Sequence, residues 1–198
     1  MTRTKIIAIW TLIAVAMTAP VAVAAFSPLL QWRDGIYIAA GFAGIVGLSL
    51  LLVQPLLAMN ALPGLTPRRS RQVHGWVGAA LVVAILIHVG GLWITSPPDV
   101  IDVLLLRSPT PFSLWGVAAM WAAFASAALV VGRRRWRLRP AIWRSLHIAL
   151  ANVIVGGTVV HALLIEGTMG TASKWAVSVI VILATAVIAT RRIFPLAR

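Results

Sequence analysis

The chain has 198 residues, of which 61% are hydrophobic and 11% charged, and its formal net charge is +13. Because a soluble domain carries about 25% charged residues, this composition excludes an ordinary water-soluble domain and indicates a protein that lipid covers. The sequence has no cysteine, which excludes disulfides, iron–sulfur clusters held by thiolates and a cysteine nucleophile.

Six apolar stretches follow one another along the chain, and none has an acidic or basic residue in its middle. A bilayer core of about 30 Å is crossed by about 20 helical residues, so each stretch is long enough to span it. We therefore predict an all-α fold, a polytopic bundle of about six transmembrane helices that forms one domain over residues 1–198. The predicted spans lie near residues 5–26, 37–59, 73–95, 112–132, 145–165 and 174–190.

The first stretch has a second interpretation. Arg3 and Lys5 precede an apolar run that ends in Ala22-Val23-Ala24, a pattern that is also typical of a cleavable secretory signal. Cleavage would leave five spans and an outer N-terminus. We favour a retained helix, because the run has full span length and a count of six spans fits the charge pattern.

The basic residues gather at alternate connections between the spans, which is the positive-inside pattern. This pattern predicts that both termini and the arginine-rich loops are cytoplasmic. Contact with anionic lipid is a further role for these residues, and we expect no nucleic-acid partner because no basic face lies away from the membrane ends. The cytoplasmic set comprises Arg3, Lys5, Arg68, Arg69, Arg71, Arg133, Arg134, Arg135, Arg137, Arg139, Arg144, Arg191, Arg192 and Arg198.

The four histidines of the chain form two matched pairs. His74 and His88 lie fourteen residues apart in the third span, and His147 and His161 lie fourteen residues apart in the fifth. Fourteen residues are nearly four helical turns, so the two histidines of each span share a face within about 40° and are about 21 Å apart along the helix axis.

Spans three and five run in the same direction, so His74 and His147 share the cytoplasmic level while His88 and His161 share the outer level. If the two spans face each other, each level offers two imidazoles to one iron, which is the arrangement that two stacked bis-histidine haems require. Histidines inside a membrane also serve proton paths or helix packing, and both remain alternatives. A single tetrahedral zinc site does not fit two pairs so far apart.

Polar and small residues near the histidines are candidates for a supporting role. Arg71 and Arg144 each precede an inner histidine by three residues, and each is either a partner for a haem propionate or only a topology-setting charge. The polar side chains of Asn152 and Thr158 in the fifth span either contact the edge of a haem or make a contact between helices. Six glycines of the two spans give room beside a porphyrin or allow close helix packing: Gly75, Gly78, Gly90, Gly91, Gly156 and Gly157.

The connection after the third span also carries a pattern. Residues 99–107 alternate acidic with aliphatic side chains, which predicts a short helix in the outer interface of the membrane. Asp99, Asp102 and Glu166 make up the outer acidic content beyond the second span. Loop acids of this kind are usually only solvated, so we assign them no chemistry.

The histidine pairs, the sequence Arg144-Ser145-Leu146-His147 after an arginine-rich loop, and the six-span layout resemble the ferric reductase-like transmembrane family. That family includes the membrane cores of ferric reductases and NADPH oxidases, and the haem-binding MsrQ (YedZ) subunit of bacterial methionine sulfoxide reductase systems. The resemblance covers nearly the whole chain. It implies b haem, with His74 and His147 as the inner ligands and His88 and His161 as the outer ligands.

The resemblance also implies a function, that of a transmembrane b-type cytochrome in the bacterial inner membrane. Such a protein is the electron-transfer component of an oxidoreductase, and it passes electrons from a cytoplasmic donor to an outer acceptor such as ferric chelate, oxygen or a periplasmic partner. Full reductases carry an FAD and NADPH domain that these 198 residues lack, so we expect FAD or FMN only on a partner, either a separate flavin reductase or, without flavin, a quinol donor. The alternative is a non-redox transporter or assembly protein whose histidines transfer protons or pack helices.

Overall fold

The structure is a computed structural model that describes the backbone of residues 1–133 and 135–193, and the side chains within these ranges up to Val187. Four of the arginines to which we assign a cytoplasmic position therefore lie outside the described residues or side chains: Arg134, Arg191, Arg192 and Arg198.

Helices make up nearly all of the described chain, and the described residues include no strand. Seven α-helices and one 3₁₀ turn follow one another: α1 (Arg3–Ala25), η1 (Pro28–Leu30), α2 (Gly35–Ala58), α3 (Pro67–Thr95), α4 (Pro97–Leu104), α5 (Pro111–Gly132), α6 (Pro140–Leu164) and α7 (Thr171–Ile193).

Five of these helices, α1, α2, α3, α5 and α6, are long and apolar enough to cross a membrane. Over its described side chains α7 is apolar for only 17 residues, Thr171–Val187, so the end of the predicted sixth span at 188–190 lies outside the described side chains. The predicted all-α polytopic bundle is confirmed, and five of its six predicted spans meet the length and composition expected of a membrane helix.

Helix α3 begins earlier than the sequence pattern predicted. The Thr66 side chain accepts a hydrogen bond from the backbone N–H of Arg69 at 3.3 Å, and Pro67 occupies the first turn. A capping threonine followed by proline is a strong helix start, so the charged residues that we assigned to a loop form the first turns of the helix. The short helix predicted over residues 99–107 is α4, which begins earlier, at Pro97, and ends earlier, at Leu104. The Ser96 hydroxyl donates to the Asp99 carboxylate in its first turn.

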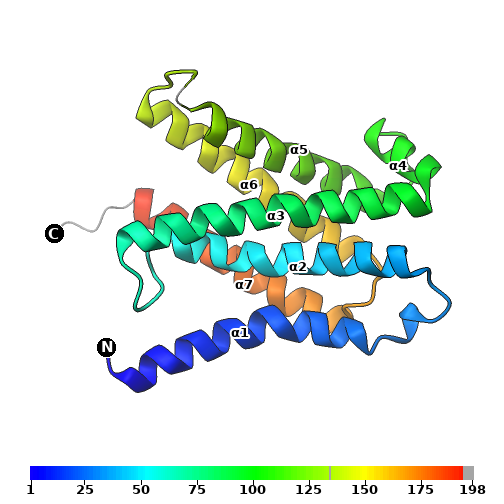
Figure 1. Cartoon of the computed structure of the whole chain (residues 1–198), viewed down its shortest axis with the longest axis horizontal. Helices are drawn as coiled ribbons and strands as arrows, with labels where there is room; N and C mark the ends of the chain where they lie inside the picture. Colours follow the sequence, from blue (N-terminus) through cyan, green and yellow to red (C-terminus); the bar gives the residue numbers. More distant parts are fainter. Residues whose placement is uncertain (134, 194–198) are drawn as a thin grey trace.

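The long helices alternate in direction, so their connections gather at two ends of the bundle (Figure 1). One end holds the start of α1, the α2–α3 and α5–α6 connections and the last turns of α7. The opposite end holds the α1–α2 connection, α4 and the α6–α7 connection. The four acidic residues of the chain all belong to this second end: Asp34, Asp99, Asp102 and Glu166.

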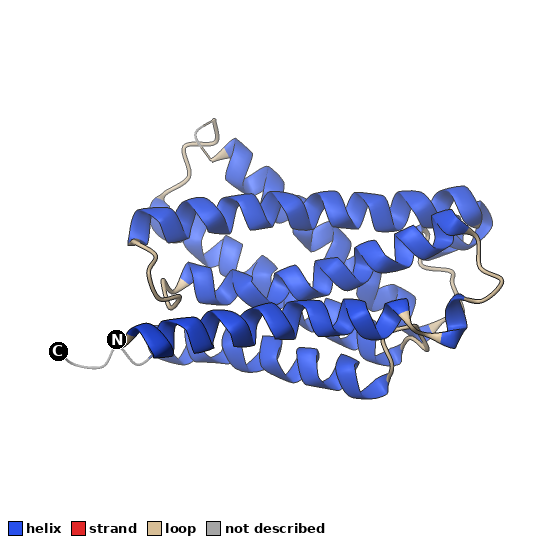
Figure 2. Cartoon of the chain, turned by 60° about the horizontal axis from the view of Figure 1, so that its bottom comes forward, coloured by secondary structure: helices blue, strands red, loops and turns tan. Residues whose placement is uncertain are grey.

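The lateral packing divides the bundle into two antiparallel hairpins, α2–α3 and α5–α6, with α1 and α7 packed beside them (Figure 2). Helix α2 is the most enclosed of the five apolar helices: 44% of the residues in its most apolar stretch are buried, compared with 6% in α1. Its Leu48, Leu51 and Leu52 belong to a core that also includes Ala122 of α5 and Val181 of α7. The outward faces carry large exposed apolar side chains, as expected where lipid is the solvent.

Candidate functional site

The four histidines meet in two pairs, one near each end of the bundle. The ring centroids of His74 in α3 and His147 in α6 lie 6.1 Å apart, with the ring planes inclined by 73°. The ring centroids of His88 and His161 lie 6.5 Å apart, with an angle of 81°. All four side chains are half-buried. The two spans thus face each other, and each level of the bundle presents two imidazoles.

These distances fit two rings that share one metal ion. A bond of about 2.0 Å from metal to imidazole nitrogen puts each ring centroid roughly 3 Å from the metal, so two rings on opposite sides lie about 6 Å apart. Among the described residues, no three His, Asp or Glu side chains gather closely enough to hold a metal ion together. Two protein ligands at each level suit a cofactor that brings its other ligands with it, as the iron of a porphyrin does.

The outer histidines are oriented by backbone carbonyls of the neighbouring helices. The Nδ1 atom of His88 lies 2.8 Å from the carbonyl oxygen of Ala40 in α2, and that of His161 lies 2.8 Å from the carbonyl oxygen of Phe112 in α5. Because a carbonyl only accepts, Nδ1 carries the proton in both rings, which leaves the unprotonated Nε2 available to a metal ion. A second partner of this kind is typical of metal-bound histidine.

Each outer ring rests on a glycine one turn beyond its carbonyl partner. A Cβ atom on Gly44 would lie 3.0 Å from Nδ1 of His88, and one on Gly116 would lie 2.7 Å from Nδ1 of His161. In an α-helix the carbonyl of residue i points toward residue i+4. A ring that donates to the carbonyl of Ala40 or Phe112 must therefore lie over residue i+4, where any side chain would obstruct it.

The inner histidines have weaker or more adaptable partners. The Nδ1 atom of His74 lies 3.3 Å from the backbone carbonyl oxygen of Gln54. The Nδ1 atom of His147 lies 3.0 Å from the hydroxyl oxygen of Ser126, which is able to donate or accept. His147 is also stacked on Trp143, with ring centroids 5.3 Å apart and an interplanar angle of 6°.

The two hairpins repeat this arrangement at a nearly constant offset. The histidines of α6 follow those of α3 by 73 residues, and the orienting residues of α5 follow those of α2 by 72 residues, from Ala40 to Phe112 and from Gln54 to Ser126. The glycines Gly44 and Gly116 keep the offset of 72. Sequence reasoning missed these α2 and α5 residues, although the repeated glycine offset beside the histidine offset was a signal for them.

The other predicted site residues lie around the pairs without a described contact to an imidazole. Arg71 and Arg144 are exposed on the first turns of α3 and α6. Of the six predicted glycines, Gly91 and Gly157 allow close helix approach, because a Cβ there would lie within 3 Å of Ala40 and of the Trp115 carbonyl oxygen, respectively. A Cβ on Gly78 would lie 3.2 Å from the Gln54 amide, whereas Gly75, Gly90 and Gly156 have nothing within 4 Å.

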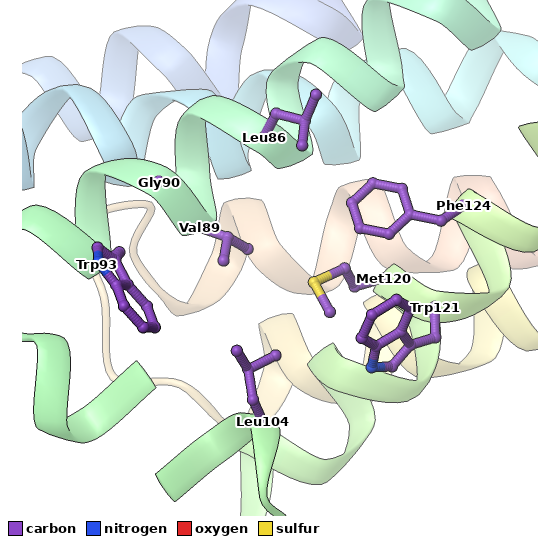
Figure 3. A pocket seen from close by; sticks show the side chains of 8 residues that line it. All are labelled: Leu86, Val89, Gly90, Trp93, Leu104, Met120, Trp121 and Phe124. Atoms are coloured by element: carbon purple, nitrogen blue, oxygen red, sulfur yellow. The ribbon is translucent and has the colours of Figure 1, made fainter. Parts of the chain in front are cut away.

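Two apolar cavities of about 330 Å³ each border the hairpins. The first lies between α3, α4 and α5, where Trp93, Leu104 and Trp121 point into it (Figure 3). Its α3 wall includes Val89 and Gly90, which directly follow His88. The second lies between α5 and α6 and is lined by Trp115, Ala118, Asn152, Val153, Gly156 and Gly157. None of the four histidines is among the residues that line these two cavities.

Comparison with known proteins gives one match. The family described as ferric reductase like transmembrane component matches residues 43–158, which run from α2 into α6. This stretch includes His74, His88 and His147 and ends three residues before His161. No curated protein and no solved structure gives a significant match. Because the match covers more than half of the 198 residues, the chain belongs to the ferric reductase-like transmembrane component family.

Proposed function

We propose that this chain is a transmembrane b-type cytochrome, which carries electrons between the two sides of a membrane through two bis-histidine haems. The observation that carries the proposal is that two imidazoles face each other at each of two levels. Their ring centroids lie 6.1 Å apart at one level and 6.5 Å apart at the other. Domains of this family generally bind haem, and family membership supports a membrane electron-transfer role.

In this proposal the chain contributes ligation, spacing and orientation. His74 and His147 hold the inner haem, and His88 and His161 hold the outer haem, about 21 Å further along the helix axis. When bound, each haem supplies a one-electron ferric–ferrous couple. The backbone carbonyls that accept from Nδ1 favour one tautomer and orientation of His74, His88 and His161 before the cofactor arrives, while the Ser126 hydroxyl is able to follow either tautomer of His147.

The charge distribution supports an orientation of the chain in the membrane. The end with the inner pair carries arginines and no acidic residue, and all four acidic residues belong to the outer end. By the positive-inside rule the basic end is cytoplasmic. The family resemblance implies that electrons enter at this side, so the proposed donor is a cytoplasmic-side reductant, either a separate flavin reductase carrying FAD or FMN, or a quinol. The acceptor lies on the outer side and is ferric chelate, oxygen or a periplasmic partner.

The test is the absorbance of the full chain purified in detergent. We expect reduced-minus-oxidised bands of b haem and two haems per chain by the pyridine haemochrome assay. A colourless preparation after expression with ample haem would contradict the proposal. That result would support instead a non-redox membrane protein that uses its histidines for proton transfer or helix packing.

A second experiment identifies the donor. Chains reconstituted in vesicles are offered either quinol in the lipid or a flavin reductase with NADH on the basic side, and haem reduction is followed by absorbance. Reduction from the acidic side alone would contradict the proposed direction. The same vesicles with ferric citrate or oxygen on the acidic side show which acceptor reoxidises the haems.

A further inference from the structure

The inner histidine of α6 has an aromatic support that the outer one lacks within the described structure. Trp143 lies one turn before His147 on the same helix face, and the two rings are nearly parallel at 6°. The aromatic neighbour of His161 is Phe112, which meets the ring edge-on at an angle of 72° and a centroid distance of 5.7 Å. The plane of His147 is therefore supported by a flat surface, whereas that of His161 is not.

An arginine covers the same indole. The guanidinium carbon of Arg133 lies 4.5 Å from the centre of the Trp143 ring, within the range of a cation–π contact. Arg133 directly follows the last residue of α5, while Trp143 lies in the first turn of α6. The contact thus joins the two helices beside their connection. The indole nitrogen is buried and makes no hydrogen bond in the described structure, so the contacts that position Trp143 are made by its ring.

The orientation of an axial imidazole has consequences at the iron. The angle between the two ligand planes determines how the iron d orbitals split, and this splitting sets the anisotropy of the ferric electron paramagnetic resonance (EPR) signal. A nearby positive charge also favours the ferrous state, which carries one unit less positive charge than the ferric state. His147 and its stacked neighbours therefore influence both the EPR signal and the midpoint potential.

We propose that Trp143 and Arg133 are positioning residues of the inner haem: Trp143 holds the plane of the His147 imidazole, and Arg133 holds Trp143 and places a positive charge on the indole that stacks on this imidazole. This inference rests on the proposed haem function. It assigns Arg133 a role at the inner haem beyond setting topology.

The test combines EPR and redox titration of the purified full chain. The H74A variant identifies the inner signal as the one it loses. Trp143→Leu should shift the low-field EPR line of the inner haem and leave the outer line in place, and Trp143→Phe, which keeps a flat ring, should retain the wild-type line. Trp76→Leu is the matched control, because Trp76 lies near His74 but is 77% exposed.

Arg133→Gln tests the charge without altering the indole. It should shift the ferric–ferrous equilibrium of the inner haem about threefold toward ferric, where a tenfold shift corresponds to about 59 mV. Arg135→Gln removes the same charge from the same loop and should have a smaller effect, because Arg133 is the one of the two that lies over the Trp143 ring in the described structure. Both variants therefore have the same net charge, and they differ only in the position of the arginine that is removed.

The outcomes separate the inference from the function on which it rests. A wild-type chain without haem would contradict the proposed function. The role of Trp143 would be overturned, and the haem function kept, if the wild type holds two haems and Trp143→Leu leaves the EPR signal of the inner haem unchanged. Equal effects of Arg133→Gln and Arg135→Gln would overturn the role of Arg133. If Trp143→Leu fails to fold, Trp143→Met takes its place, because it also removes the flat ring. An inner signal identical to the wild type in Trp143→Met would again overturn the role of Trp143.

Discussion

Gly116 and His161 are in such close contact that no side chain fits between them: a Cβ on Gly116 would lie 2.7 Å from the imidazole Nδ1. The same relationship joins Gly44 and His88, with a distance of 3.0 Å. Both rings are also held by a carbonyl at 2.8 Å. A ring displaced by a methyl group would lose that hydrogen bond as well as its orientation.

Alanine at these glycines should therefore weaken the outer haem. We expect Gly116→Ala to lose much of the outer haem and Gly44→Ala to lose less, since overpacking a tight contact costs about 1–3 kcal/mol and the contact at Gly116 is closer. The haem content per chain and the EPR line of the outer haem measure the effect. Gly41→Ala in α2 is the control, because a Cβ there meets nothing within 4 Å. Equal losses at Gly41 and Gly44 would contradict the explanation.

Single histidine variants should each remove one haem of two. His74→Ala should abolish the inner haem and His161→Ala the outer haem, because each level has one imidazole from each hairpin, and a bis-histidine haem needs both. The double variant His74→Ala/His147→Ala should still hold one haem, since both changes fall at the same level. Haemochrome stoichiometry measures this. Loss of both haems in that folded double variant would show that the levels are not independent sites.

Ser126 is the one Nδ1 partner in this set that acts through its side chain, so it is the one that mutation removes directly. With Nε2 bound to iron, Nδ1 of His147 would carry the proton and donate a hydrogen bond to the Ser126 hydroxyl oxygen. Loss of such a partner typically lowers metal affinity by about 10–100-fold and makes the ligand less basic. Ser126→Ala should therefore weaken inner-haem binding and raise its midpoint potential, as haem titration and redox titration would show.

A control for this variant is Ser49→Ala, since Ser49 is also buried in a helix but makes no hydrogen bond in the described structure. An inner-haem potential that stays unchanged or falls in Ser126→Ala would contradict the proposed role of the hydroxyl.

The inclined ring planes predict a spectroscopic property of both haems. Angles of 73° and 81° are closer to perpendicular than to parallel, and crossed imidazoles leave two iron d orbitals nearly equal in energy. We expect two strongly anisotropic low-spin ferric signals at low field in EPR spectra recorded near liquid-helium temperature. A rhombic signal typical of parallel imidazoles at either site would show that the rings rotate when haem binds.

Much of the architecture could be predicted because it depends on properties that the sequence displays directly. Apolar length determines which segments span, and alternating arginine loops determine which helix ends share a side. The spacing of fourteen residues from His74 to His88 places both on one face of α3, and the equal spacing in α6 led us to expect two levels. The structure brings the four rings together in these two pairs, while their role as ligands stays a prediction.

The residues that orient the histidines were missed for a physical reason. Ala40, Gln54 and Phe112 act through backbone carbonyls, which every residue has, so their side chains carry no signal. Which carbonyl lies beside which ring depends on the register between the two helices of a hairpin, and packing sets that register. The stack of Arg133 on Trp143 likewise depends on the path of the connection between α5 and α6.

The division into two hairpins has a consequence for assembly. Within each hairpin the helices pack along their length, but α3 meets α5, and α2 meets α6, at far fewer places. Helix α7 packs against both α2 and α6, so it joins the two hairpins on one side. Each facing pair of imidazoles has one ring from each hairpin. In the proposed haem-bound chain, each cofactor would therefore add a cross-link between the hairpins to the one that α7 provides, and loss of haem should loosen the hairpins from each other before it loosens either hairpin itself.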